Sequence, residues 1–167
     1  MTNNSIMRRL RFTFNFNDDK MIDLFRKAGK ETTRAEISDW LKRDDHDDFK
    51  NLNDQNLAYF LNGFIIENRG KKDGETPVAE KKLTNNTIFR KLKIALNYKD
   101  EDILDIYDLV EMRISKHELS AFFRKPDHQH FRLCKDQFLR NFLQGLQLKY
   151  ASDRMIKEEE LEGNETY

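Results

Sequence analysis

Groups that could bind a metal gather in one short stretch, Asp44-Asp45-His46-Asp47-Asp48. A related stretch, Pro126-Asp127-His128-Gln129-His130, lies further along the chain, with Cys134 shortly after it. Carboxylates, imidazoles and thiolates are metal ligands, but the spacing matches neither an EF-hand nor a zinc motif. Only an Asp-His pair is shared, and both residues are ordinary in turns. We therefore predict no metal site and interpret both stretches as solvated loops that could bear an interaction.

Two cationic triplets, each beside an apolar residue, are the second group that could do chemistry. Their members are Arg8, Arg9 and Arg11, and then Arg90, Lys91 and Lys93. Such clusters could bind phosphate, and Phe12 could stack on a base. Alternatively they form a charged helix face whose long stems cover apolar surface. The chain has 30 basic and 30 acidic side chains, and this zero net charge favours the second interpretation.

Signatures of enzymatic chemistry are missing from the sequence. It has no Gly-rich phosphate loop and no nucleophile motif, and neither Cys134 nor any of the 4 His lies in a catalytic pattern. We therefore predict no catalytic residues, no cofactor and a non-enzymatic protein.

An internal duplication organises the chain. The stretch from Asp54 to Gly63 reads Asp-Gln-x-Leu-x-x-Phe-Leu-x-Gly, and the same pattern returns from Asp136 to Gly145, 82 residues later. At this interval residues 3–68 align with residues 85–150 without a gap. The predicted units are repeat one at 1–68, a flexible linker at 69–84, repeat two at 85–150 and an acidic tail at 151–167. The tail could extend the last helix for a turn or two and then fray.

Each repeat is predicted to be a group of about four helices, which makes the protein all-α. Leu57, Phe60, Leu61 and Phe64 follow a helical period and form a buried stripe. Only 2 Pro and 6 Gly favour long regular elements. A Gly stands inside the stripe of both copies, at positions 63 and 145, and this indicates close packing of another backbone. We expect the two repeats to pack about a pseudo-twofold axis, because one such unit alone is marginal.

Helix boundaries follow from capping residues. The first helix is expected to begin after Asn3-Asn4-Ser5 and after Asn85-Asn86-Thr87, and the second to be capped by Asp18 or Asp100. The third opens with the capping boxes Thr33–Glu36 and Ser115–Glu118 and stops at Asp44 or Pro126. Trp40 is predicted to be buried, and Phe49 or Phe131 to anchor the following loop in the core.

Phe12 and Ile94 do not fit the inner stripe of their helices and lie among the cations instead. The same exception in both copies suggests one cause. We predict that the two residues meet at a seam between the repeats. The alternative is an exposed patch that awaits a partner or a second copy of the chain.

The cellular compartment is predicted from what the sequence lacks. A single Cys excludes an internal disulfide and fits a reducing environment. The first residues form no apolar leader, and no apolar run is long enough to span a membrane. We expect a soluble protein of the cytoplasm.

Several motifs together resemble the bacterial YehS-like family. They are Asn-Asn-x-Ile-x-Arg-x-Leu from Asn3 and Asn85, Phe-Leu-x-Gly from Phe60 and Phe142, and Pro126-Asp127-His128 followed by Phe131 and Asp136-Gln137-Phe138-Leu139-Arg140. The resemblance covers residues 3 to about 150 and implies a domain of unknown function in tandem. Repeat one departs from the pattern with Asp44 in place of Pro126 and Asn56 in place of Phe138. The family implies a fold but no activity.

Two functional hypotheses follow. The first is a scaffold that presents loops 44–52 and 126–134 to another macromolecule, with Asp45, His46, Asp127 and His128 as candidate contacts. The second is nucleic-acid binding by the two cationic triplets. We expect the partner to be a protein rather than a nucleic acid or a membrane, and pairing with a second copy of the chain stays open.

Overall fold

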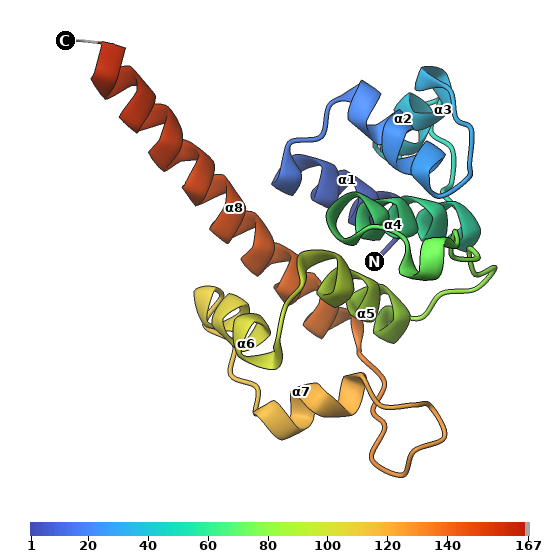
Figure 1. Cartoon of the computed structure of the whole chain (residues 1–167), viewed down its shortest axis with the longest axis vertical. Helices are drawn as coiled ribbons and strands as arrows, with labels where there is room; N and C mark the ends of the chain where they lie inside the picture. The colour runs from blue at the N-terminus through green and yellow to red at the C-terminus, as the bar shows by residue number, and fades with distance from the viewer. Residues whose placement is uncertain (166–167) are drawn as a thin grey trace.

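Helices make up the regular structure of the protein, whose computed structural model describes residues 1–165 (Figure 1). The first half contains α1 (Asn3–Phe14), α2 (Asp18–Lys27), α3 (Arg34–Leu41) and α4 (Asp54–Arg69). The second half contains α5 (Asn85–Leu96), α6 (Asp100–Leu109), α7 (Lys116–Phe122) and α8 (Asp136–Glu165). A short 3-10 turn, η1 (Lys72–Gly74), lies in the linker, and the described residues contain no strand. The predicted all-α fold of two four-helix repeats is confirmed.

The first helix of each repeat packs against the last helix of the other repeat. Helix α1 lies along α8 of the second repeat, and α5 lies along α4 of the first, which is the same contact made twice (Figure 1). Within each repeat α2 packs on α4 and α6 packs on α8. These paired contacts give the predicted pseudo-twofold arrangement, and both repeats contribute to one continuous core.

Glycine permits the closest of these contacts. A Cβ atom at Gly63 would lie 1.8 Å from the carbonyl oxygen of Leu24 in α2. One at Gly145 would lie 2.6 Å from the carbonyl oxygen of Ile106, the corresponding residue of α6. The prediction that another backbone packs at both positions is confirmed.

The helix starts differ by a few residues from the predicted ones. Helix α1 begins at Asn3, with Thr2 as its N-cap, and α5 begins after Thr84. Helix α2 is capped by Asn17, so that Asp18 and Asp100 are first helical residues rather than caps. The Thr2 hydroxyl takes the capping role in α1, while the side chains of Asn3 and Asn4 hydrogen-bond to other segments.

The capping box of α3 and the position of Trp40 agree with prediction, whereas α7 has only the hydroxyl half of its predicted box. The Thr33 hydroxyl accepts from the Glu36 amide, and the Glu36 carboxylate accepts from the Thr33 amide. In α7 the Ser115 hydroxyl accepts from the Glu118 amide. Trp40 is 7% exposed, and its ring lies 5.5 Å from that of Phe25.

The third helices end earlier than predicted, and the loops after them have different anchors. Helix α3 ends at Leu41 and α7 at Phe122. The predicted anchors Phe49 and Phe131 are only half-buried and lie outside the core. Their place is taken by Leu52 and Cys134, which are 1% and 4% exposed. A buried thiol behaves as a small apolar side chain, so Cys134 substitutes for Leu52 in the second repeat.

The predicted seam of Phe12 and Ile94 is wrong. These side chains are 58% and 42% exposed, and they lie on the outer faces of α1 and α5. The repeats meet through neighbouring positions instead. The ring of Phe14 packs 4.8 Å from that of Tyr150 in α8, and Asn68 of α4 donates to the Ala95 carbonyl of α5.

The linker and the tail are more regular than predicted. Linker residue Ala79 is buried, so the linker lies against the helices. Helix α8 continues through the tail to Glu165 as an arm that projects from the body (Figure 1). The predicted turn or two is too short, and residues 166–167 lie outside the described part of the chain. No helix within residues 1–165 combines the length and the apolarity that a membrane span requires.

Candidate interaction surfaces

A buried asparagine fixes the loop that follows α3. The side-chain amide of Asn4, which is fully buried, donates to the Trp40 carbonyl at 2.9 Å and to the Lys50 carbonyl at 2.8 Å. Its oxygen accepts from the Leu52 amide at 3.0 Å. One side chain in α1 thus joins the end of α3, at Trp40, to Lys50 and Leu52 near the end of the loop.

The second repeat contains the same arrangement. Asn86 donates to the carbonyls of Phe122 and Arg132 at 3.0 and 2.8 Å and accepts from the Cys134 amide at 2.9 Å. Sequence reasoning assigned these asparagines to capping and missed this role. The available signal was the Asn-Asn pair at one position of both copies, where a single cap needs only one Asn.

The neighbouring asparagine joins the repeats to each other through the Asp of the repeated motif. Asn3 donates to Asp54 at 2.7 Å, and the second oxygen of Asp54 accepts from the amide of Leu83, just before α5. Asn85 donates likewise to Asp136 at 2.7 Å, and the other oxygen of Asp136 pairs with the Met1 ammonium at 3.0 Å. The Asn85 hydrogen bond, followed by the ammonium, lowers the pKa of Asp136.

The candidate loop residues have two different roles. Residues 43–48 and 125–130 are exposed. The Nδ1 atom of His46 accepts from the Asp48 amide at 3.0 Å, and that of His128 accepts from the His130 amide at 3.0 Å. Both imidazoles therefore shape a turn, whereas the carboxylates of Asp45 and Asp127 lie in exposed positions. No three His, Cys, Asp or Glu side chains within residues 1–165 converge as a metal site requires.

Most of the six candidate cations are paired within the fold. Arg8 donates to the Lys42 carbonyl at 3.0 Å, and Arg90 donates to the Phe123 carbonyl at 3.2 Å. Arg11 pairs with Asp18 at 2.8 Å, and Lys93 pairs with the corresponding Asp100 at 2.8 Å. The last two triplet members contact the other repeat: Arg9 donates to the Arg140 carbonyl, and Lys91 to the Asn62 side chain. Four of these cations therefore bond within their own repeat, and the other two bond across to the other repeat.

Comparison with known proteins assigns the chain to a family. Residues 3–70 and 85–151 each match the family described as "Protein of unknown function (DUF1456)". The chain belongs to this family. It is 38% identical over 147 residues to "Uncharacterized protein YehS" of Escherichia coli (strain K12), a match that covers 87% of this chain and 94% of that protein. No solved structure matches the chain. The resemblance noted from the sequence is confirmed, and the two matched segments correspond to the two helical repeats.

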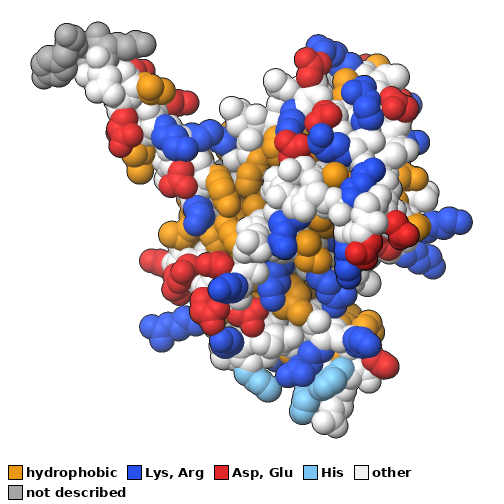
Figure 2. Space-filling view, in the orientation of Figure 1, with side chains coloured by type: hydrophobic (Ala, Val, Ile, Leu, Met, Phe, Trp, Pro, Cys, Tyr) orange, Lys and Arg blue, Asp and Glu red, His pale blue; other side chains and the backbone are white. Residues whose placement is uncertain are grey.

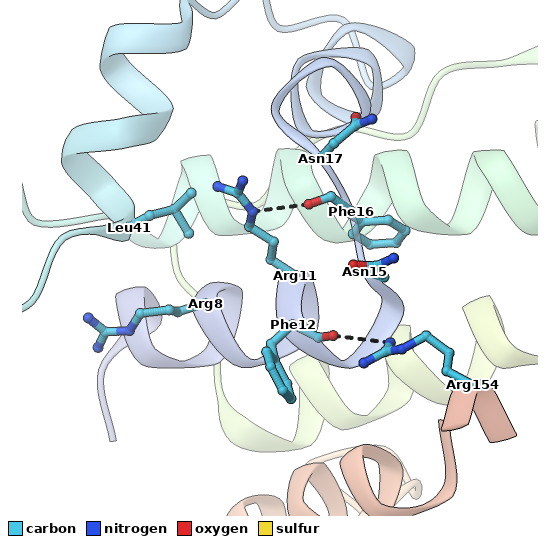
Figure 3. Close-up of a pocket in the computed structure, with 8 residues that line it drawn as sticks. All are labelled: Arg8, Arg11, Phe12, Asn15, Phe16, Asn17, Leu41 and Arg154. Atoms are coloured by element: carbon cyan, nitrogen blue, oxygen red, sulfur yellow. Dashed lines mark hydrogen bonds between the residues drawn. The ribbon is translucent and has the colours of Figure 1, made fainter. Parts of the chain in front are cut away.

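In this member of the family, Arg8 stands at the centre of a hollowed surface. One hollow joins it to Arg43, Asp44 and Asp45, so the structure brings two candidate residues together. A second hollow, of about 620 Å³, is lined by Arg8, Arg11, Phe12 and Arg154 among others (Figure 3). The Arg154 guanidinium donates to the carbonyls of Phe12 and Thr13 and lies 5.8 Å from the Phe12 ring. On the side of the molecule that Figure 2 shows, lysine and arginine side chains are spread among apolar and acidic ones.

The single thiol is held in its protonated form. Cys134 is buried, and burial, followed by the nearby Asp136, raises the pKa of its thiol to about 12. The thiolate is the reactive form of cysteine, so this residue suits a role in packing.

Proposed function

We propose that the protein is a non-enzymatic interaction protein that binds another protein through loops 44–52 and 126–134. The observation that supports it is the asparagine arrangement, in which three hydrogen bonds fix the backbone of each loop at Asn4 and at Asn86. The side chains of residues 44–48 and 126–130 in these loops still face the solvent.

Fixed loops with free side chains suit binding for a thermodynamic reason. A mobile loop loses conformational entropy when a partner orders it, and this loss weakens the complex. Here the backbone is already ordered by buried hydrogen bonds, which are costly to break. Loops on a rigid scaffold are also the usual place for binding residues. Because both repeats hold their loops alike, the protein presents two related surfaces.

The chemistry of the remaining candidate groups supports binding over catalysis. The Cys134 thiol is protonated, the two histidine rings are used in turns, and most of the cations pair within the fold. Phosphate binding by the triplets would have to replace these pairs. A reducing compartment such as the cytoplasm suits the single buried thiol.

Site-specific photo-cross-linking in bacterial cells tests the proposal. A photoreactive amino acid is placed at Asp45, at Asp127 or, as a control, at Asp105, an exposed position on α6. We expect both loop positions to form an adduct with the same partner protein and the control to form none. The partner should then bind the purified protein, and the Asp45→Ala, Asp127→Ala double variant should bind about tenfold or more weakly.

Two results would contradict it. One is equal adduct yield from the loops and from Asp105, since the capture would then be non-specific. The other is an absence of loop adducts combined with turnover of a metabolite by the purified protein.

A further inference from the structure

The internal symmetry of the chain produces two equivalent grooves. The first lies between α1 and α8 and is lined by Ser5, Arg8, Arg9, Phe12 and Gln147. The corresponding residues of the duplication line a groove between α5 and α4, and they are Thr87, Arg90, Lys91, Ile94 and Ile65. We name these the α1–α8 groove and the α4–α5 groove.

A peptide segment of the chain itself lies in the α4–α5 groove. Linker residues from Gly70 to Glu80 contribute to its lining, and Ala79 is 6% exposed. Both carboxylate oxygens of Glu80 lie 3.0 Å from the ammonium of Lys91. From the end of α4 the linker returns alongside this helix to its start, where Leu83 reaches Asp54. The structure thus shows an extended segment that runs along this kind of groove, with the Glu80 carboxylate paired to the groove cation and the preceding Ala79 buried.

The α1–α8 groove has no such cover among the described residues. Helix α4 ends at Gly70, whose φ of +75° turns the chain back toward the linker. The corresponding residue is Ser152, where α8 continues; it still contacts α1 through Arg154, and its last residues lead away from the body (Figure 1). The central Phe12 side chain is accordingly 58% exposed, and α1 presents an open face to the solvent.

The two grooves also differ in whether their corresponding cation, Lys91 or Arg9, is paired with a carboxylate. Lys91 has the Asn62 side chain at 2.6 Å and the Glu80 carboxylate as partners. Its counterpart Arg9 donates to the Arg140 carbonyl at 3.4 Å and forms no ion pair within residues 1–165. Burial, and then the positive charge of Arg140, lower the pKa of Arg9. Glu80 therefore neutralises Lys91 in the α4–α5 groove, whereas no carboxylate within residues 1–165 neutralises the corresponding Arg9 in the α1–α8 groove.

We propose that the α1–α8 groove binds an extended acidic segment of a partner protein, in the way that the linker lines the α4–α5 groove and pairs Glu80 with Lys91. A carboxylate of that segment pairs with Arg9, and the adjacent small residue allows the backbone to approach the helices. The inference rests on the proposed function in assigning a protein partner, but it concerns a different surface from the loops.

A titration followed by NMR tests this directly. The probe is a synthetic peptide of residues 75–80, which has two carboxylates and no cationic side chain, added to the isotope-labelled full-length protein. We expect saturable shifts of amide signals in α1 between Ser5 and Phe12 and in α8 near Gln147. Arg9→Gln should weaken the apparent affinity about tenfold, and a peptide with Gln in place of Glu80 should show the same loss. Arg34→Gln, which removes an exposed arginine of α3, should leave the affinity unchanged.

Each other outcome would overturn the proposal. Shifts confined to α4 and α5 would show that the peptide only replaces the linker. Affinity that is insensitive to Arg9→Gln would place the peptide elsewhere. A short single-stranded oligonucleotide that shifts the same signals when the peptide does not would identify a phosphate site instead. The Asp45→Ala, Asp127→Ala variant should bind the peptide normally, so failure of the loop proposal and failure of this one give different results.

Discussion

The two repeats share their buried hydrogen bonds but differ in what covers their outer faces. Asn4 and Asn86 make the same three hydrogen bonds, with lengths that differ by 0.1 Å or less. The outer faces of α1 and α5 carry corresponding side chains, but a peptide segment covers only the second. Duplication has therefore preserved the interactions that hold a repeat together. Which outer face stays exposed depends on the last helix of the repeat, since α4 ends at Arg69 and α8 continues. This contrast gives predictions for both the shared interior and the unequal exterior.

The tightest shared contact gives the largest expected effect. Gly63→Ala should destabilise the protein by more than about 5 kcal/mol, above the usual ~1–3 kcal/mol for overpacking. The reason is that the new Cβ would meet the rigid backbone of Leu24 at 1.8 Å. Gly145→Ala should cost less, because part of its clash is with the Ile106 side chain, which can move. Urea denaturation followed by circular dichroism measures both.

The control for the glycine pair lies on the same helix as Gly145. A Cβ at Gly163 meets nothing within 4 Å, so Gly163→Ala should be neutral or slightly stabilising. If Gly63→Ala unfolds the chain completely, the milder Gly145→Ala still gives a measurable midpoint. Equal midpoints for Gly145→Ala and the wild type would show that α6 and α8 pack less closely than described.

Trp40 tests a position where the repeats use different aromatic residues. Trp40→Ala should cost ~3–5 kcal/mol, the range for a large aromatic removed from a core. Trp40→Phe should cost less, because the corresponding residue of the second repeat is the buried Phe122. Native tryptophan fluorescence should be blue-shifted and should move to longer wavelength in urea. A native spectrum already at long wavelength would place Trp40 in the solvent.

The asparagines test whether the repeats are energetically equivalent. Asn4→Leu and Asn86→Leu should each cost ~2–4 kcal/mol, because each leaves two backbone carbonyl groups and one backbone amide without partners, and most of these hydrogen bonds are buried. Since the hydrogen bonds correspond, we expect the two losses in unfolding free energy to be similar. Asn3→Ala, whose partners are only part-buried, should cost less than either. A large difference between Asn4→Leu and Asn86→Leu would mean that one loop has further support.

Much of the interior could be predicted because its signals are local and occur twice. A capping box is visible in the types of Thr33 and Glu36 alone. The glycines 63 and 145 interrupt an apolar period that continues beyond them, which only close packing explains. Trp40 follows the helical period of its neighbours. In each case the position in the sequence determines which face of the helix the residue occupies. The second repeat supplies a second example of the same pattern.

The exterior could not be predicted because it depends on where distant segments go. The composition of residues 69–84 indicates flexibility, but the pairing of Glu80 with Lys91 requires knowledge of the path of the linker. Gly70 and Ser152 are aligned positions, but their types alone do not show that the chain turns at the first and stays helical at the second. The signal that could have identified Cys134 as a packing residue is its alignment with Leu52.

The smallest predicted effect concerns the pair that was expected to form the seam. Phe12 is 58% exposed and Ile94 is 42% exposed, so neither side chain removes much apolar area from water. Phe12→Ser should therefore change the unfolding free energy by only about 0.5 kcal/mol, as is usual for surface positions. Ile94→Ser should cost somewhat more, about 1 kcal/mol, because the Ile94 side chain lines the α4–α5 groove. A loss of several kcal/mol for Phe12→Ser, measured by urea denaturation, would mean that this ring packs between the repeats after all. The α1–α8 groove would then be closed in solution, and no peptide could enter it.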